Sequence, residues 1–453
     1  MEKIPQINKE KSEIEISYDS EKIKNRIEVI YPKLFEDYKE IHTHPELGGE
    51  EFETSKLIQE RLKELGIQIL ANDIYGTGVV AEIVGKEDGS TVALRADIDA
   101  LALTENPEHE IKSDTEGKMH ACGHDIHTTS LLGAAEILKE MANNNELEGR
   151  VILLFQPNED KAIHRKSGAV SMAKYLEEKG LRDRIKAFSA LHVVGPVERG
   201  TVFLADRIQY AGSSAIKLEL KTLGGHGSEI RVLPDIDYLL SDIKVKVSDQ
   251  LAEYWDKKEA VVDSMNPRTS TDTDNIIVSE GSRVWTIRVI SEDHKRVTGE
   301  IQEKIKNIIE ESILKHKKQF SERASNHLPQ KSSETQEIEL DISIIPNTRP
   351  TVYRNHVLVD MVDSVAQASL SDFKRIKEGL LATDDFSFLL EEFRGKEIPG
   401  TYMAVGGANK EKGISGQHHS PDFQVDPESI KDLTAIHVGT VLESIKYFNE
   451  QVK

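Results

Sequence analysis

The sequence predicts an α/β fold, in which a smaller α+β domain is inserted into a larger three-layer α/β/α domain. Three observations support this prediction. Short apolar segments alternate with helical segments through the first 210 residues, strands with one charged face appear from about residue 211, and the earlier pattern returns after about residue 347. Buried strands that alternate with helices indicate a sheet with helices on both of its faces.

The strands predicted for the larger domain are short apolar runs bounded by turn residues. They lie at 78–84, 91–96, 150–155, 187–193 and 402–407. The helices predicted around them have apolar residues at helical spacing. They lie at 53–66, 130–142, 168–180 and about 427–449. We expect the first of these helices to end at Gly66, because glycine is common just after a helix C-terminus.

The inserted domain is predicted to have strands of a different kind, at 214–221, 284–290 and 338–345. In the first of them Ile216, Leu218 and Leu220 alternate with charged residues, which is typical of a strand with one solvent-exposed face. The polar stretch 316–336 is expected to be a helix end and a loop. The predicted parts of the chain are a charged lead-in at 1–25, a larger domain at 26–210 and 348–453, and an inserted domain at 211–347.

Composition and charge argue against several classes of protein. The 453 residues carry a formal net charge of −21, which disfavours binding to nucleic acids and anionic membranes, because both need a basic surface. No apolar run approaches the ~20 residues of a membrane-spanning helix, and the charged N-terminus lacks the apolar stretch of a secretion signal. A single cysteine suits a reducing compartment. We therefore expect a cytoplasmic protein.

The single cysteine, Cys122, lies in the run HACGHDIH (120–127) together with three histidines and an aspartate. A lone cysteine is more often a small buried apolar residue than a metal ligand. Here, however, Cys122 and His124 lie where a loop is expected to meet a helix that becomes regular after His127, and a helix N-terminus favours a thiolate. Three interpretations are therefore open: a packed residue, a nucleophilic thiol or a metal ligand.

Further residues suited to metal binding or acid–base chemistry follow the ends of predicted strands. They are Asp99 after 91–96, Glu159 and Asp160 after 150–155, and His192 at the end of 187–193. A distant loop, GQHHSPDF (416–423), adds two histidines. Ligands of open α/β sheets bind at the carboxyl ends of strands, so we expect these side chains to meet at one edge. The alternatives are that Asp97 and Asp99 cap a helical turn and that His192 is a core histidine.

Taken in order, these motifs resemble the M20 family of metal-dependent peptidases and amidohydrolases. The resemblance is closest to the branch with hippurate hydrolase, N-acetyl-diaminopimelate deacetylase and the auxin-conjugate (IAA-amino acid) hydrolases. The matching segments, from about residue 42 to 425, are HTHPELGGEEFET, LRADIDALALTE, HACGHDIHTTSLLGAA, FQPNED, ALHV, GGHGS, DDFSF and HHSPDF. The resemblance implies that the larger domain binds metal and is catalytic, and that the inserted domain is a ferredoxin-like lid and dimerisation domain.

The resemblance also implies a role for individual residues of the larger domain. Two divalent metal ions would be held by Cys122, as a bridging thiolate, and by His124, Asp160, His192 and His419. Glu159 would be the general base, and Asp99 would orient a metal-bound histidine. We expect the neighbouring histidines to pack or to support ligands rather than to bind metal. These are His120, His127 and His418.

Candidate residues of the inserted domain follow from the same resemblance. His226, in GGHG, would contact the substrate carbonyl, usually across a dimer interface. Arg288 and Arg231 are candidates for binding a substrate carboxylate, although each is equally compatible with a structural role. Asn275 is a further candidate for substrate binding.

The implied reaction is hydrolysis of the amide bond of a small N-acyl amino acid or dipeptide-like substrate by a metal-activated water. A set of thiolate, imidazole and carboxylate ligands suits Mn²⁺, Zn²⁺, Co²⁺ or Ni²⁺. The expected partners are a small-molecule amide and a second copy of the chain, with no nucleic acid and no membrane.

Several positions depart from the pattern of this branch. Asp160 stands where the branch commonly has Glu, which shortens the carboxylate by one methylene, and Asn158 replaces a small residue. The run KAIHRKSGA (161–169) replaces a glycine-rich segment, and SEIR (228–231) replaces a small residue, Pro and His. Two alternatives are open, the first of which is motivated by Asp160 and SEIR. One is a catalytically degenerate member that binds a small molecule or partner, and the other is a thiol hydrolase that uses Cys122.

Overall fold

The computed structural model describes residues 15–160, 167–230, 233–257, 259–269, 275–327, 337–346, 348–391 and 397–452. The chain divides into two compact units. The first unit comprises Met1–Gln209, Val352–Gly379 and Asp385–Lys453, and the second comprises Tyr210–Thr351 and Leu380–Asp384. Each unit has its own hydrophobic core, which is the mark of a separate domain.

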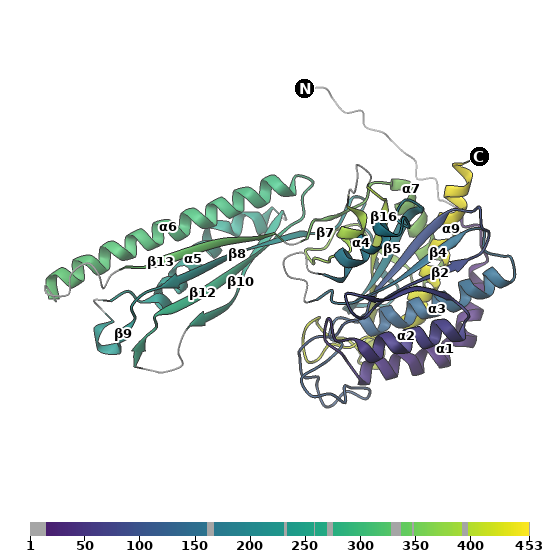
Figure 1. Cartoon of the computed structure of the whole chain (residues 1–453), viewed down its shortest axis with the longest axis horizontal. Coiled ribbons are helices and arrows are strands. Elements are labelled where there is room, and N and C mark those ends of the chain that lie inside the picture. Colours follow the sequence, from purple (N-terminus) through teal and green to yellow (C-terminus); the bar gives the residue numbers. More distant parts are fainter. Residues whose placement is uncertain are drawn as a thin grey trace, which may run out of the picture. The chain divides into compact units, whose positions relative to one another are not determined.

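An eight-stranded sheet forms the centre of the first unit (Figure 1). Its strands, in order across the sheet, are β1 (Gln68–Ile74), β2 (Gly78–Val84), β4 (Arg150–Gln156), β3 (Thr91–Asp97), β5 (Ile185–Glu198), β16 (Gly400–Ala408), β6 (Thr201–Phe203) and β15 (Lys374–Ile376). The neighbours β4, β3, β5 and β16 are parallel. Most of their residues are buried, as expected of parallel strands with both faces covered, and this explains their continuous apolar runs.

Helices cover both faces of this sheet, which confirms the predicted α/β fold class. On one face lie α1 (Ser20–Thr43), α2 (Phe52–Glu64), α3 (His124–Asn143), α7 (His356–Ser369) and α9 (Ser429–Glu450). On the other face lie α4 (Gly168–Glu178) and the short α8 (Ser387–Leu390). A 3₁₀ turn, Lys410–Lys412, follows β16.

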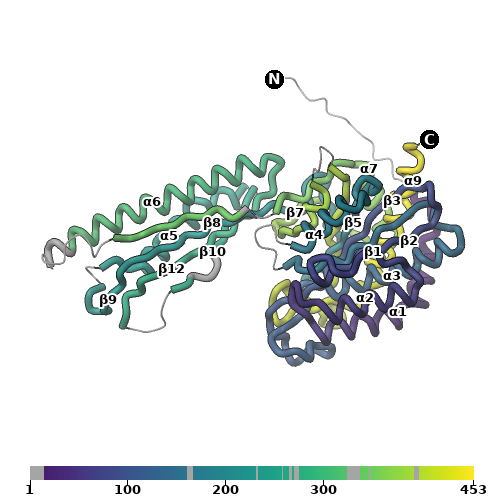
Figure 2. The backbone as a smooth tube through the Cα atoms, viewed as in Figure 1, coloured from purple at the N-terminus to yellow at the C-terminus, as the bar shows by residue number. Residues whose placement is uncertain are grey.

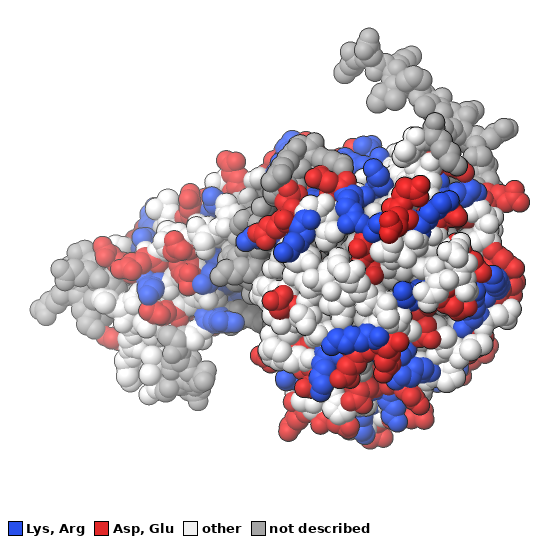
Figure 3. Space-filling model, turned by 45° about the vertical axis from the view of Figure 1, so that its right-hand side comes forward, with Lys and Arg blue, Asp and Glu red and all other residues white. Residues whose placement is uncertain are grey.

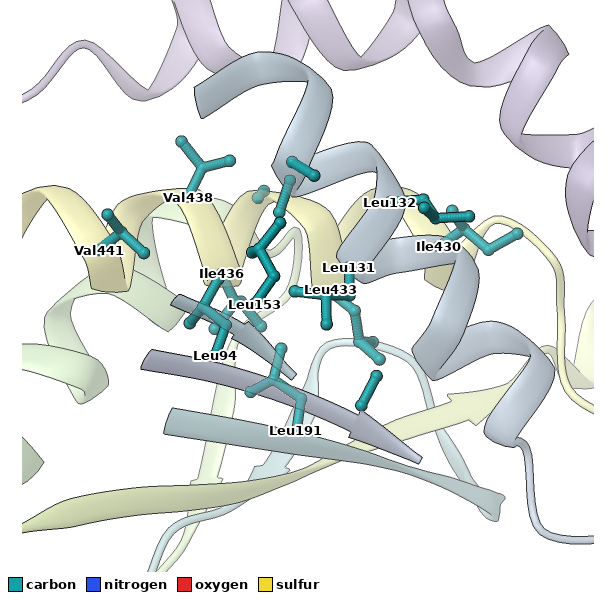
Figure 4. Close-up of a cluster of buried hydrophobic side chains, with 14 of the residues drawn as sticks. Leu94, Leu131, Leu132, Leu153, Leu191, Ile430, Leu433, Ile436, Val438 and Val441 are labelled. Atoms are coloured by element: carbon teal, nitrogen blue, oxygen red, sulfur yellow. The ribbon is translucent and has the colours of Figure 1, made fainter. Parts of the chain in front are cut away.

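The main core of the first unit lies between the parallel strands and the helices α3 and α9. Figure 4 shows Leu94, Leu153 and Leu191, from three neighbouring strands, facing Leu131 of α3 and Leu433 of α9. The exposed fraction of each of these side chains is 2% or less. This packing holds the ends of β3, β4 and β5 and the start of α3 in a defined arrangement.

The second unit contains a four-stranded antiparallel sheet with two helices on one face (Figure 2). Its elements, in chain order, are β8 (Gly212–Lys221), α5 (Ile236–Asp256), β10 (Ala260–Thr269), β12 (Glu280–Val289), α6 (His294–His327) and β13 (Glu339–Pro346). The strand order is β10-β12-β8-β13. This βαββαβ connectivity is the predicted ferredoxin-like arrangement.

Smaller elements complete the second unit and the segments where the chain enters and leaves it. They are β9 (Gly225–His226), which pairs with β11 (Ile276–Ile277), a 3₁₀ turn at Gly227–Glu229, and β7 (Ile208–Tyr210), which pairs with β14 (Thr351–Val352). In β8 the side chains of Ile216, Leu218 and Leu220 are buried, in agreement with the alternation in the sequence.

Element ends differ from the sequence-based expectation at several points. Helix α1 begins at Ser20, so part of the predicted 1–25 lead-in is helical. Helix α3 begins at His124, not after His127, because Gly123 ends the preceding loop and serves as the N-cap. Strand β5 continues beyond residue 193 to Glu198. The polar stretch 316–336 is helical as far as His327, and its remainder, 328–336, lies outside the described residues.

On the face of the molecule shown in Figure 3, acidic and basic side chains of the described residues are interspersed. Among the helices that the structure describes, none combines the length and the apolar character that crossing a membrane requires.

Candidate metal centre

The sulfur of Cys122 lies at the centre of a group of histidines. Its Sγ is 3.5 Å from Nε2 of His192, 3.4 Å from Nε2 of His419 and 3.8 Å from Nδ1 of His418. Cys122 is buried, with an exposed fraction of 7%. Its Sγ also lies within 4.8 Å of possible ligand atoms of His124 and of Asp160. The five predicted ligands therefore share one small pocket.

Gly123 places Cys122 and His124 on either side of a tight turn. Its φ is +93°, a left-handed conformation that glycine adopts without strain. A Cβ at this position would also collide with a methyl group of Val193. Glycine therefore allows the loop to approach β5 closely, and the first residue of α3 points its side chain into the pocket.

One ring nitrogen of His124 is held by hydrogen bonds, and the other has no hydrogen-bond partner among the described residues. Its Nδ1 lies 2.9 Å from the backbone oxygen of Asp99 and 3.2 Å from Oδ1 of the same residue. Its Nε2 is buried and makes no hydrogen bond with the described residues. Oxygens of Asp97, Glu159 and Asp160 lie 3.6, 4.0 and 4.0 Å from Nε2, beyond ordinary hydrogen-bond distance. This arrangement leaves one imidazole nitrogen facing three carboxylates.

Glu159 and Asp160 follow the carboxyl end of β4, as predicted. The backbone N–H of Asp160 donates to Oδ2 of Asp99 at 3.0 Å. Oδ1 of Asp160 lies 3.5 Å from Nε2 of His419. Both acidic side chains are about 10% exposed. The shorter carboxylate at position 160 therefore still reaches the histidines of the pocket.

His192 lies within β5 and is supported from behind. Its Nδ1 donates to the backbone oxygen of Val193 at 2.7 Å, which leaves Nε2 directed at the sulfur of Cys122. The backbone N–H of Val193 donates to Nε2 of His127 at 2.8 Å, and Nδ1 of His127 lies 2.6 Å from Oδ1 of Asp97. His127 thus links Asp97 to the strand that carries His192.

The loop 416–423 reaches the pocket through a backbone contact. The N–H of His419 donates to the backbone oxygen of Ala121 at 2.9 Å, and His419 adopts a φ of +58°. Its neighbour His418 accepts a hydrogen bond at Nε2 from the N–H of Gly195. Both histidines contact the sulfur, and Nε2 of His419 also lies 3.5 Å from Oδ1 of Asp160.

Burial and neighbouring charges determine the protonation of these groups. Burial, together with Asp160, raises the pKa of the Cys122 thiol well above its usual value. Burial and the neighbouring His127 lower the pKa of His192. Burial alone would raise the pKa of Asp97, but His124 and Arg95 outweigh it and hold that pKa well below the usual range. Asp97 is therefore a buried anion directly behind the pocket.

The predicted residues His226, Asn275 and Arg288 belong to the second unit. His226 is exposed in β9, where its Nδ1 lies 2.8 Å from Oγ of Ser228. The backbone oxygen of Asn275 accepts from the N–H of Gly227 at 2.8 Å, so Asn275 lies beside His226. Arg288, in β12, donates to the backbone oxygen of Leu381 at 3.4 Å. Arg231 lies outside the described residues.

A comparison with known protein families identifies the family of the chain. Residues 93–443, well over half of the chain, match the model described as peptidase family M20/M25/M40. The chain belongs to this family. Family membership confirms the resemblance inferred from the motifs and the prediction of a hydrolase.

The proteins similar in sequence to this M20 family member include enzymes with different names. The IAA-amino acid hydrolase ILR1-like 4 of Arabidopsis thaliana is 31% identical over 88% of this chain and 83% of the relative. Thermostable carboxypeptidase 1 of Saccharolobus solfataricus is 29% identical over 95% of this chain and 99% of the relative. Among solved structures, the YXEP protein of Bacillus subtilis, described as a dinuclear metal binding peptidase from M20 family, matches with a TM-score of 0.67. It is 22% identical, and the match covers 92% of this chain and 99% of that one.

The residues present fit a pair of divalent metal ions. Thiolate and imidazole ligands together with carboxylates suit Zn²⁺, Mn²⁺, Co²⁺ or Ni²⁺ better than Ca²⁺ or Mg²⁺. The buried Nε2 of His124, which faces carboxylates without bonding to them, is the donor that a cation would satisfy. His192 and His419 each direct Nε2 at the same sulfur.

Several residues that support the pocket were missed or left open by the sequence analysis. Arg95 donates to Asp97 at 2.7 Å and to Gln156 at 2.9 Å, and its Nη2 lies 3.3 Å from Asp385. The spacing of Arg95 and Asp97 could have revealed their pairing, because residues two apart share one face of a strand. The helix-capping alternative for Asp97 is not what the structure shows, since this carboxylate binds Arg95 and His127.

A second buried cluster, centred on His42, joins α1 to the first turn of α3 and to the loop that carries Glu105. Nδ1 of His42 lies 2.6 Å from Oδ2 of Asp125, and Nε2 lies 3.2 Å from Oε1 of Glu105. His109 lies 2.9 Å from the same oxygen of Glu105. Burial alone would lower the pKa of His42, but its hydrogen bonds to Asp125 and Glu105 raise that pKa to about 10.

Replacing His42 with Ala is expected to lower the free energy of unfolding by about 3–5 kcal/mol at pH 6.5, because buried Asp125 loses its cation and buried Glu105 loses one of its two histidine partners. The folded-state pKa of His42 is raised above 6.5 to about 10. The stabilisation is therefore complete below pH 6.5 and is lost as the pH rises through 10. Urea unfolding of both proteins across this range measures the difference.

The predicted signature is a difference between wild type and His42→Ala that shrinks as the pH rises. The other groups facing His42, the ring of Tyr38 and the imidazole of His120, are common to both proteins. His44→Ala, at a side chain 55% exposed, is the matched control and is expected to change little. A difference that stays constant up to pH 10 would show that His42 is neutral in the folded protein.

Proposed function

We propose that the protein hydrolyses the amide bond of small N-acyl amino acids or dipeptide-like substrates and uses two divalent metal ions. The observation that carries the proposal is the convergence of the predicted ligands on one buried sulfur in a member of the M20 family. The ligands are Cys122, His124, Asp160, His192 and His419. Relatives named as hydrolases of IAA-amino acids and as an N-acetyl-L-cysteine deacetylase support this substrate class.

When bound, two such ions would acidify a shared water and polarise the substrate carbonyl. Glu159 accepts the proton of the attacking water and passes it to the leaving amine, so the carboxylate acts first as a base and then as an acid. Its place at the end of β4, with Oε2 4.0 Å from Nε2 of His124, supports this role. Asp99 holds His124 through Nδ1, which fixes the direction of the other ring nitrogen.

We also propose that the second unit supplies groups that bind the substrate. His226 donates a hydrogen bond to the oxyanion as charge develops on the carbonyl oxygen. Arg288 and Arg231 bind a carboxylate of the substrate, with Asn275 beside His226 as a further polar contact. The exposure of His226 supports a role toward a molecule outside its own unit. The protein acts as a homodimer through this unit, and a single thiol is consistent with action in the cytoplasm.

A panel of N-acetyl, N-benzoyl and dipeptide substrates tests the proposed function. The apoprotein is loaded in turn with Mn²⁺, Zn²⁺, Co²⁺ or Ni²⁺, and release of the free amine is measured. We expect turnover of at least one substrate with one or more of these metals, and none after chelation. Light scattering of the same sample measures the molar mass, for which we expect twice that of the chain.

The alternatives open in the sequence predict different results. A degenerate binding protein would bind few or no divalent ions and would turn over no substrate of the panel. A thiol hydrolase would retain activity after exhaustive chelation and lose it when Cys122 is alkylated. Either result would overturn the proposed metal-dependent reaction.

A further inference from the structure

The segment from Pro157 to Asp160 carries the proposed base. It packs closely against three glycines. A Cβ at Gly48 would lie 2.5 Å from the side-chain oxygen of Asn158, and a Cβ at Gly78 would lie 2.6 Å from the ring of Pro157. A Cβ at Gly168 would collide with the backbone oxygen of Pro157. At these three positions the surrounding chain approaches the segment so closely that only glycine fits. The segment therefore has little room to shift.

Two buried carboxylates hold the backbone on either side of Glu159. The N–H of Asn158 donates to Oε1 of Glu51 at 2.9 Å, and the N–H of Asp160 donates to Oδ2 of Asp99 at 3.0 Å. Hydrogen bonds from N–H groups to a carboxylate are stronger than those to a neutral acceptor. The residue between these two tethers is Glu159.

Asn158 adopts a left-handed conformation, with φ at +49°. Non-glycine residues rarely adopt this conformation, and they keep it where the surroundings enforce it. The tether to Glu51 and the contact with Gly48 act on this residue. Its unusual backbone turns the chain directly before Glu159 and so sets the direction in which the base points.

Glu51 is itself held firmly. Its exposed fraction is 0%, and its second oxygen accepts a hydrogen bond from the hydroxyl of Thr77 at 2.6 Å. The neighbouring Glu50, by contrast, has a side chain that is 58% exposed. Burial costs a carboxylate much of its hydration, so a buried carboxylate needs hydrogen-bond donors. For Glu51, one of these donors is the N–H of Asn158, the residue before the proposed base.

We propose that Glu51 is a positioning residue for the reaction, which holds Glu159 in place through the backbone of Asn158. This inference rests on the proposed function of Glu159 as the base. Glu51 binds the backbone N–H of Asn158, so its effect reaches the chemistry through the segment 157–160. Displacing a catalytic group by about 1 Å can lower a rate by about 100-fold.

Glu51→Ala and Glu51→Gln in the metal-loaded enzyme test this inference. The alanine variant loses the acceptor, and we expect kcat to fall by about 100-fold while KM and metal content stay unchanged. The glutamine variant is expected to recover at least a tenth of the wild-type kcat, because its amide oxygen accepts from Asn158 and its amide N–H donates to the hydroxyl of Thr77. Hydrogen exchange of the peptide around 157–160, followed by mass spectrometry, is expected to be faster in Glu51→Ala than in Glu51→Gln.

Two controls separate this role from general loss of structure. Glu50→Ala removes an adjacent exposed carboxylate, and Thr77→Val removes the side-chain hydroxyl that binds Glu51 but keeps the bond of Glu51 to Asn158. Both variants are expected to retain kcat within about threefold. Glu159→Gln, measured in parallel, tests the proposed function itself. If Glu159→Gln is inactive but Glu51→Ala keeps the wild-type kcat, or loses it only with its metal, the positioning role is wrong. If Glu159→Gln remains active, the proposed base is wrong instead.

Discussion

Replacing Glu159 with Gln is expected to lower kcat by about 10²–10⁴-fold, the usual contribution of a general base. Glutamine has nearly the same shape as glutamate, but its amide does not accept a proton at neutral pH. The side chain lies at the end of β4 with its Oε2 4.0 Å from Nε2 of His124, close to the ligands but not assigned as one of them. We therefore expect the metal content of the variant to equal that of the wild type.

The measurement pairs steady-state kinetics with metal analysis of the same preparation. Glu53→Gln, at an exposed glutamate of α2 whose side chain is 73% exposed, is the matched control and is expected to leave both quantities unchanged. A Glu159→Gln variant with wild-type kcat would show that another group takes the proton. A variant that loses its metal as well as its activity would place Glu159 among the ligands.

Replacing Cys122 with Ala is expected to remove activity and to weaken metal binding by at least 100-fold. Loss of a residue that only orients a ligand typically lowers metal affinity by about 10–100-fold, and Cys122 is proposed to contact both ions directly. Its Sγ lies 3.5 Å from His192 and 3.4 Å from His419, so removing it also leaves a gap between two imidazoles. Titration of the apoprotein with Zn²⁺ against a competing chelator measures the change.

His418→Ala is the informative comparison for Cys122→Ala, because His418 also contacts the sulfur but was predicted to support rather than to bind metal. We expect His418→Ala to weaken metal binding by no more than about 100-fold and to keep both ions at saturation. Equal losses in the two variants would make His418 a ligand. Unchanged metal affinity in Cys122→Ala would remove the sulfur from the site.

The sequence predicted the fold class well because buried strands and amphipathic helices carry distinct apolar patterns. Strand β2 was predicted at its observed bounds. The start of α3 was placed too late, because the polar residues His124, Asp125 and His127 give no apolar periodicity, although they form the buried first turn of that helix. Gly123, at positive φ before that turn, is the signal that could have located the helix start.

The residues of the pocket were predicted from motifs that resemble the M20 family. The strand ends by themselves indicated only that Asp99, Glu159, Asp160 and His192 meet at one edge of the sheet. Their supports were harder to predict. Glu51 lies in the polar run GGEEF beside the exposed Glu50, and nothing local distinguishes the buried carboxylate from the exposed one. His42 and Glu105 are far apart in sequence and meet only in the folded chain. Such long-range hydrogen bonds depend on tertiary packing, which periodicity does not report.

The central claim is that one sulfur, from Cys122, joins two metal ions in a single pocket. X-ray absorption of the Zn²⁺-loaded protein, together with its metal content, tests this claim most directly. We predict two ions per chain, a sulfur in the coordination shell of the zinc, and a zinc–zinc distance of about 3.5–4 Å. A shell of only nitrogen and oxygen, or the absence of bound zinc at saturating concentration, would contradict the account.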